Sequence, residues 1–214
     1  MKVIASCVVS VLAVSSAQAG LVNPLIQPWA GGPNSQFAQW DSFTSAFGGL
    51  NLPDAPGSAA FSLMNFSPDA IITGSGNIYG SNSPLYVMVM GSSLAGQTPL
   101  QVVANIATAG NFIPDGGVRL VFFNNLGNSV TINPATTEVR SESPTPPAGA
   151  ARTTAFVFDT TGVSFVSTGF RLEMNGAPTN MAIDAIRLDL GYVPGPGALA
   201  LLAVAGLGVR RRRA

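Results

Sequence analysis

The side chains that could do chemistry here are carboxylates, arginines, tyrosines and hydroxyls, because the 214 residues include no histidine. The one lysine, Lys2, and the one cysteine, Cys7, both lie near the start of the chain. These absences remove serine–histidine–aspartate and cysteine–histidine nucleophiles, Schiff-base lysines and most transition-metal sites. Paired carboxylates could still hydrolyse glycosides. The ten acidic residues form no recognisable pair, so we assign no catalytic residue and expect no enzyme.

Two of these acids lie in the last regular segment of the chain, "IDAIRLDLG". Its alternation sets Ile186, Leu188 and Leu190 on one face and charged residues on the other. We therefore expect Asp184 and Asp189 to lie on a solvated strand face, without a catalytic role.

Calcium needs only oxygen ligands, so a structural calcium site remains open although no other cofactor is expected. The candidate ligands are Asp41, Asp54, Asp69 and Asp115. The last three lie in turns rich in proline and glycine, where an aspartate commonly caps the backbone instead. The sequence contains no D-x-[DN]-x-[DN]-G loop, and we name no metal ligand.

Three aromatic residues near residue 40 have two possible roles. Trp40, Phe43 and Phe47 could anchor the first strand in the core, or they could form a platform that stacks against a sugar ring. Aromatic residues are usually buried, so the core role is favoured.

The elements that must position these residues are short strands separated by glycine and proline. The segments expected to contain strands are 59–66, 69–74, 85–91, 99–110, 116–127, 151–162, 169–176 and 183–191. Period-two alternation of apolar residues is typical of half-buried strands, and the segment 20–192 shows no long helical period. The fold class is therefore all-β, an antiparallel β-sandwich over residues 20–192. A jelly roll is the preferred version and an immunoglobulin-like sandwich the second.

Two segments between the expected strands are predicted to be irregular. The proline-rich stretch 141–150 is predicted to be an exposed loop. The glycine-rich stretch 74–83 has no following lysine, so it is predicted to be a hairpin connection and not a phosphate-binding loop.

The first 19 residues have the pattern of a secretory signal peptide. Lys2 precedes an apolar run, and Ala17-Gln18-Ala19 matches the small-residue pattern of a signal peptidase site. We expect cleavage after Ala19, which makes Gly20 the mature N-terminus. Removal of Cys7 with the signal would leave no cysteine for a disulfide.

The last 22 residues, "VPGPGALALLAVAGLGVRRRRA", combine two prolines, a short apolar run and an arginine cluster. The apolar run 198–209 would span about 18 Å as a helix, against a hydrocarbon core of about 30 Å. By the positive-inside rule the arginines stay cytoplasmic and the domain lies outside. The membrane-stop residues are Arg210, Arg211, Arg212 and Arg213.

This layout resembles the PEP-CTERM sorting signal of Gram-negative bacteria. The sorting motif comprises Val193, Pro194, Gly195 and Pro196, with Gly195 where the family usually has glutamate. The resemblance implies recognition by an exosortase, a membrane transpeptidase, after transient anchoring in the inner membrane through a short transmembrane helix. It also implies delivery to the envelope, often in bacteria that make exopolysaccharide.

The charge distribution excludes one class of partner. Between the two ends lie five arginines and ten acidic residues, a formal charge of about −5 without a basic cluster. Nucleic-acid binding needs clustered lysine and arginine, so we expect no such partner. The sequence thus predicts an exported protein of the cell surface or extracellular matrix, with a structural or adhesive role and carbohydrate as a candidate partner. The alternative is a secreted glycan-binding or glycan-processing domain.

Overall fold

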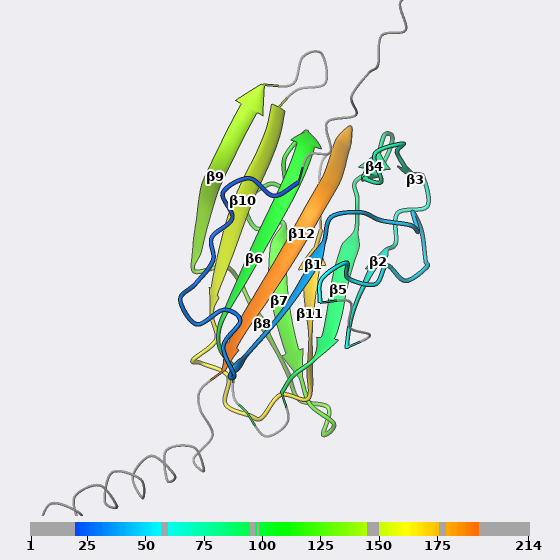
Figure 1. Cartoon of the computed structure of the whole chain (residues 1–214). Helices are drawn as coiled ribbons and strands as arrows, with labels where there is room; N and C mark the ends of the chain where they lie inside the picture. The colour runs from blue at the N-terminus through cyan, green and yellow to red at the C-terminus, as the bar shows by residue number, and fades with distance from the viewer. Residues whose placement is uncertain are drawn as a thin grey trace, which may run out of the picture.

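The computed structural model describes residues 20–56, 60–94, 97, 99–144, 150–175 and 179–192. These residues contain twelve β-strands and no α-helix, and the strands form two antiparallel sheets that lie one in front of the other (Figure 1). The all-β antiparallel prediction is confirmed, while jelly-roll connectivity stays a prediction. Among the described residues no helix is long and apolar enough to cross a membrane.

The larger sheet has seven strands. Its order is β3 (Ala70–Ile72), β4 (Ile78–Gly80), β12 (Met181–Tyr192), β6 (Pro99–Gly110), β10 (Ala150–Asp159) and β9 (Thr136–Pro144), and β1 (Ser35–Trp40) also pairs with β12. The smaller sheet has five strands, in the order β2 (Phe61–Asn65), β5 (Val87–Ser92), β11 (Gly169–Met174), β7 (Val118–Phe123) and β8 (Ser129–Ile132).

The core lies between the two sheets and takes alternate residues from most strands, while β9 contributes none. In β12 the core residues include Ile186, Leu188 and Leu190, as the alternation predicts, and each is fully buried. Opposite them, Phe170 of β11 packs beside Phe122 of β7 with ring centroids 6.3 Å apart. Burial of these apolar surfaces supplies the main stabilisation of the domain, because the described residues contain no disulfide.

Strand β12 organises the seven-stranded sheet. It pairs with β6 over almost its whole length, with β4 at its start and with β1 towards its end. The register to β6 shifts between Ile183 and Ala185, which leaves Asp184 as the extra residue of a β-bulge. Such a bulge interrupts the alternation of side chains.

Two local predictions need correction. The predicted loop 141–150 is partly strand, because Ser141–Pro144 belongs to β9 and Ala150 begins β10. Backbone pairing between neighbouring strands outweighs the polar, proline-rich composition there. The segment 74–83 does form a hairpin connection, but it also contains strand β4, which pairs with β3.

Candidate functional site

The residues predicted to direct sorting lie outside the described part of the chain. They are Val193, Pro194, Gly195, Pro196, Arg210, Arg211, Arg212 and Arg213 at one end and Ala17 and Ala19 at the other. The described residues that adjoin them are Tyr192, the last residue of β12, and Gly20.

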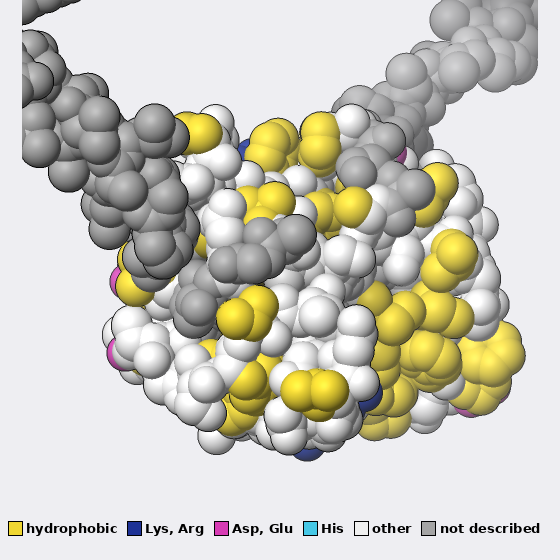
Figure 2. Space-filling view, turned by 90° about the horizontal axis from the view of Figure 1, so that it is seen from below, with side chains coloured by type: hydrophobic (Ala, Val, Ile, Leu, Met, Phe, Trp, Pro, Cys, Tyr) yellow, Lys and Arg dark blue, Asp and Glu magenta, His cyan; other side chains and the backbone are white. Residues whose placement is uncertain are grey.

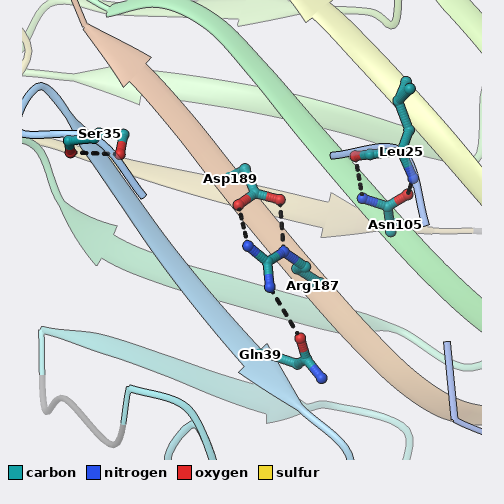
Figure 3. A network of polar contacts seen from close by, with 7 residues as sticks. Leu25, Ser35, Gln39, Asn105, Arg187 and Asp189 are labelled. Carbon is teal, nitrogen blue, oxygen red and sulfur yellow. Dashed lines mark hydrogen bonds and ion pairs between the residues drawn. The ribbon is translucent and has the colours of Figure 1, made fainter. Parts of the chain in front are cut away.

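An irregular segment, residues 20–34, covers the outer face of the seven-stranded sheet. Figure 1 shows this first described segment crossing in front of β6, β10 and β9. The backbone amide of Val22 donates to Thr153 Oγ1 at 3.0 Å. Further along, Asn105 accepts from the Leu25 amide at 2.7 Å and donates to the Leu25 carbonyl at 3.0 Å (Figure 3). Asn105 satisfies a backbone unit that has no strand partner, so the segment is fixed by side chains of the sheet.

The prediction that Asp184 and Asp189 lie on a solvated face is wrong. Asp184 is 1% exposed and Asp189 is fully buried. The side-chain alternation places Asp189 away from the core residues of β12, but it would place Asp184 on the same face as Ile186, and the bulge is what turns Asp184 to the outer face. The alternation also could not show that the segment 20–34, which has no periodicity of its own, lies over part of this face.

Asp189 is neutralised where it lies. Arg187 donates to both of its carboxylate oxygens, at 2.9 and 2.8 Å, and to the Gln39 amide oxygen at 3.2 Å (Figure 3). The guanidinium also lies over the ring of Phe37, 4.6 Å from its centroid. A bidentate pair of this kind satisfies both charges, so Asp189 is not free for chemistry, and Arg187 links β12 to β1.

Asp184, by contrast, has no cationic partner among the described residues. Asn77 Nδ2 donates to its Oδ1 at 2.6 Å, but its buried Oδ2 has no hydrogen-bond partner there. The Oδ1 atom of Asn77 is also buried without one. Burial raises the pKa of Asp184 from 3.8 to about 7, because desolvation disfavours the carboxylate. A buried group with an unused oxygen is a candidate binding group.

Asp184 lines a cavity of about 360 Å³ on the outer face of the seven-stranded sheet. The cavity is bounded by the start of the covering segment and by strands β6, β9, β10 and β12. Its lining residues are Gly20, Val22, Ala107, Thr108, Ser141, Glu142, Ser143, Ala151, Arg152, Thr153 and Asp184. Apart from Asp184, the charged lining residues are Arg152 and Glu142. Hereafter we call this cavity the Asp184 cavity.

Arg152 and Glu142 are already paired with each other. Arg152 donates to Glu142 Oε2 through Nε at 3.0 Å and through Nη2 at 2.7 Å. Its guanidinium also lies over the ring of Phe112, 3.5 Å from the centroid. The cavity therefore offers one carboxyl group that titrates near neutral pH, whereas glycoside hydrolysis uses two acting together.

A second concave site lies at the opposite end of β12. A groove of about 400 Å³ is lined by Pro28, Trp29, Gly32, Pro33, Asn34, Leu100, Gly191 and Tyr192. The half-buried indole of Trp29 lies against Gly191, where an added Cβ would be 2.9 Å from the ring, and its Nε1 donates to Gln101. Sequence reasoning did not single out Trp29, because its surroundings carry no alternation and no motif.

The aromatic and aspartate candidates have mostly structural roles. Trp40 and Phe43 are buried, which confirms their placement in the core, while Phe47 is 54% exposed. Asp54 Oδ2 accepts from the backbone amides of Asp41 and Ser42, at 2.7 and 3.0 Å. The described residues hold no group of three or more acidic, histidine or cysteine side chains that could bind a metal ion.

Comparison with known proteins identifies no family. No family model matches the chain, and no curated protein matches it. One solved structure that it resembles is the enzymatically active domain of tailspike protein 4 from bacteriophage CBA120, at 9% identity and a TM-score of 0.25. The match covers 80% of this chain and 22% of that one.

Proposed function

We propose that this chain is an exported, non-catalytic protein of the cell surface or extracellular matrix with a structural or adhesive role. A PEP-CTERM-like tag, residues 193–214, delivers it. The proposal combines the signal pattern at residues 1–19 and the tag pattern with an all-β domain between them. Its direct partners are an exosortase and the inner membrane, and exopolysaccharide is the expected partner outside.

The main support for this proposal is the apolar surface at the end of the domain where β12 finishes, next to the tag. Strand register places the end of β12 beside the start of β6, and the ends of β5 and β7 beside the start of β11. Apolar side chains are exposed in these strand ends and their loops: Leu100 (41%), Phe123 (37%), Leu126 (85%) and Val166 (50%). Figure 2 views the molecule from this end, where hydrophobic side chains lie among uncharged polar groups and charged ones are sparse. Such a surface suits a domain held close to a bilayer by the segment that follows.

The attachment point also suits a protein that bears tension. Tyr192 is 4% exposed, and its hydroxyl donates to the Gln36 side chain of β1 at 2.7 Å. Strand β12 has antiparallel neighbours on both sides, β6 and β1, at this end. A pull on residue 193 along the strand would load many backbone hydrogen bonds together, which suits a role in adhesion or in a matrix.

The test of sorting uses variants of the tag in a Gram-negative host that has an exosortase. Replacing Pro194 and Pro196 by alanine should leave the protein in the inner membrane. Replacing Arg210–Arg213 by serine should disturb retention and processing, because the positive charges hold the tag in its orientation. Immunoblots of the fractionated cells report both effects. Wild-type release and wild-type size in both variants would overturn the sorting proposal.

Glycan binding is the second candidate, and the groove at Trp29 favours it. Aromatic faces in concave sites can stack on the apolar face of a sugar ring, and Trp29 is held by Gln101 and Gly191. Processed protein applied to a polysaccharide array distinguishes the two functions. Binding that Trp29→Ala abolishes and Phe47→Ala preserves would support the glycan-binding role. Absence of binding at high protein concentration would leave the structural role, while turnover of a glycan would support the glycan-processing alternative.

A further inference from the structure

The Asp184 cavity contains a buried acceptor and the residue at which the signal is expected to end. Gly20 and Asp184 both line it, although they are far apart in the sequence. Val22 is fixed to Thr153 only two residues after Gly20, so the start of the mature chain is tied to the sheet beside the cavity. The cavity is therefore closed on one side by the segment whose first residue signal peptidase would expose.

Signal removal would create a positively charged group without a partner. The described lining of the cavity has none, because its one cation, Arg152, is paired with Glu142. Hydrolysis of the Ala19–Gly20 bond consumes one water molecule and leaves a carboxylate on Ala19 and an amine on Gly20. The amine takes up a proton, since an α-amino group has a pKa of about 7.7–8.0. The resulting ammonium group carries three hydrogen-bond donors and a positive charge.

The cavity offers one matching acceptor, Asp184 Oδ2, which is buried and has no hydrogen-bond partner among the described residues. Asn77, which donates to Asp184 Oδ1, does not line the cavity. The other charged lining residues, Arg152 on β10 and Glu142 on β9, neutralise each other, while β6 contributes uncharged Ala107 and Thr108. A buried carboxylate without a partner is costly, and an ammonium group at hydrogen-bond distance would remove that cost.

We propose that the α-ammonium group of Gly20 enters the Asp184 cavity after signal cleavage and forms an ion pair with Asp184. The pair locks residues 20–34 onto the seven-stranded sheet, so the domain reaches its full stability only once it has been exported and processed. This inference rests on the cleavage that the proposed function includes. It adds a maturation-dependent contact that neither sorting nor glycan binding requires.

The composition allows a selective chemical test, because Lys2 is the only lysine. A chain cut after Ala19 carries a single primary amine, so an amine-reactive reagent reports on Gly20 alone. The full-length protein is recovered after export, and mass spectrometry establishes its first residue. Its rate of labelling by acetic anhydride is then measured against pH, beside the free peptide Gly-Leu-Val-Asn-Pro, which matches residues 20–24.

An ion pair raises the pKa of the amine, so the protein should be labelled at least about fivefold more slowly than the peptide at pH 8. Asp184→Asn should restore the rate to within about twofold of the peptide. Asp115→Asn, which changes an exposed acid outside the cavity, should leave labelling slow. Equal rates for protein and peptide, or slow labelling that persists in Asp184→Asn, would overturn the ion pair.

A second variant keeps the test decisive if Asp184→Asn does not fold. One glycine inserted before Gly20 leaves the domain unchanged and displaces the amine by about 3.5 Å. Its labelling should match that of the peptide, and labelling as slow as in the wild type would contradict the proposal. A protein that keeps its signal contradicts both this inference and the proposed export. A cleaved protein with an ordinary amine contradicts only the ion pair.

Discussion

Asp184 is the residue whose surroundings have the largest consequences. It lies at a bulge in β12, fully enclosed, with one hydrogen bond from Asn77 and one oxygen without a partner among the described residues. Burial keeps this carboxyl group protonated up to a higher pH than usual, so the free energy of unfolding depends on pH. The α-ammonium group of Gly20 would reverse that preference.

The coupling can be measured in processed protein whose α-amine is acetylated, so that no ammonium group faces Asp184. Because the folded pKa is about 7 and the ordinary value 3.8, the folded state holds a proton that the unfolded state has lost between these pH values. The free energy of unfolding should therefore fall as pH rises from about 4 to 7, by up to about 4 kcal/mol, and level off above that range.

Urea denaturation at a series of pH values measures this slope. In acetylated Asp184→Asn protein the contribution of this group should vanish, and the unfolding free energy between pH 4 and 7 should be flatter. Identical pH profiles for the two acetylated proteins would contradict the role of Asp184.

Glu173 is a buried acidic residue that is paired with two arginines. Its carboxylate is buried on the outer face of the five-stranded sheet, and both Arg119 and Arg171 donate to it. Glu173→Gln would leave two guanidinium groups facing a neutral amide, so we expect a loss of about 1–3 kcal/mol of unfolding free energy. Glu142→Gln removes a more exposed pair and should cost less than about 1 kcal/mol. Equal losses in the two variants would refute this difference.

Strand β5 packs closely against two core rings at Gly91. A Cβ added to Gly91 of β5 would lie 2.6 Å from the Phe170 ring and 2.9 Å from the Phe61 ring. Gly91→Ala must therefore displace two core rings, at a cost of about 1–3 kcal/mol. Gly162→Ala is the control, because no heavy atom lies within 4 Å of its added Cβ. Thermal denaturation should show a clearly lower Tm for the first variant, and an equal Tm would contradict the packing described.

The strands themselves were largely predictable, because their alternation is a local property of the sequence. The segment "GFRLEMNG" shows this, since Phe170 and Leu172 are buried as predicted. The pairing of β6 with β10 and β12 was not predictable, because these strands meet across long sequence separations. The Asp184 cavity also escaped prediction, since it depends on the bulge and on the irregular segment 20–34.

The whole molecule has two ends with different roles. Residues 20–34 begin at the Asp184 cavity, near the start of β12, while the tag would leave from the apolar end where β12 finishes. Export would thus act on the two ends of the chain at opposite ends of the domain. Signal cleavage would complete the covered face of the seven-stranded sheet, and tag recognition would begin one residue beyond Tyr192.

We propose that both ends of the chain are signals that are removed. Intact-mass and terminal-peptide mass spectrometry of the protein recovered from the surface or medium of its producing cell tests both ends at once. We predict a chain that begins at Gly20 and ends near Pro194, without Arg210–Arg213. Recovery of a chain that still carries Met1 or the terminal arginines would contradict the account.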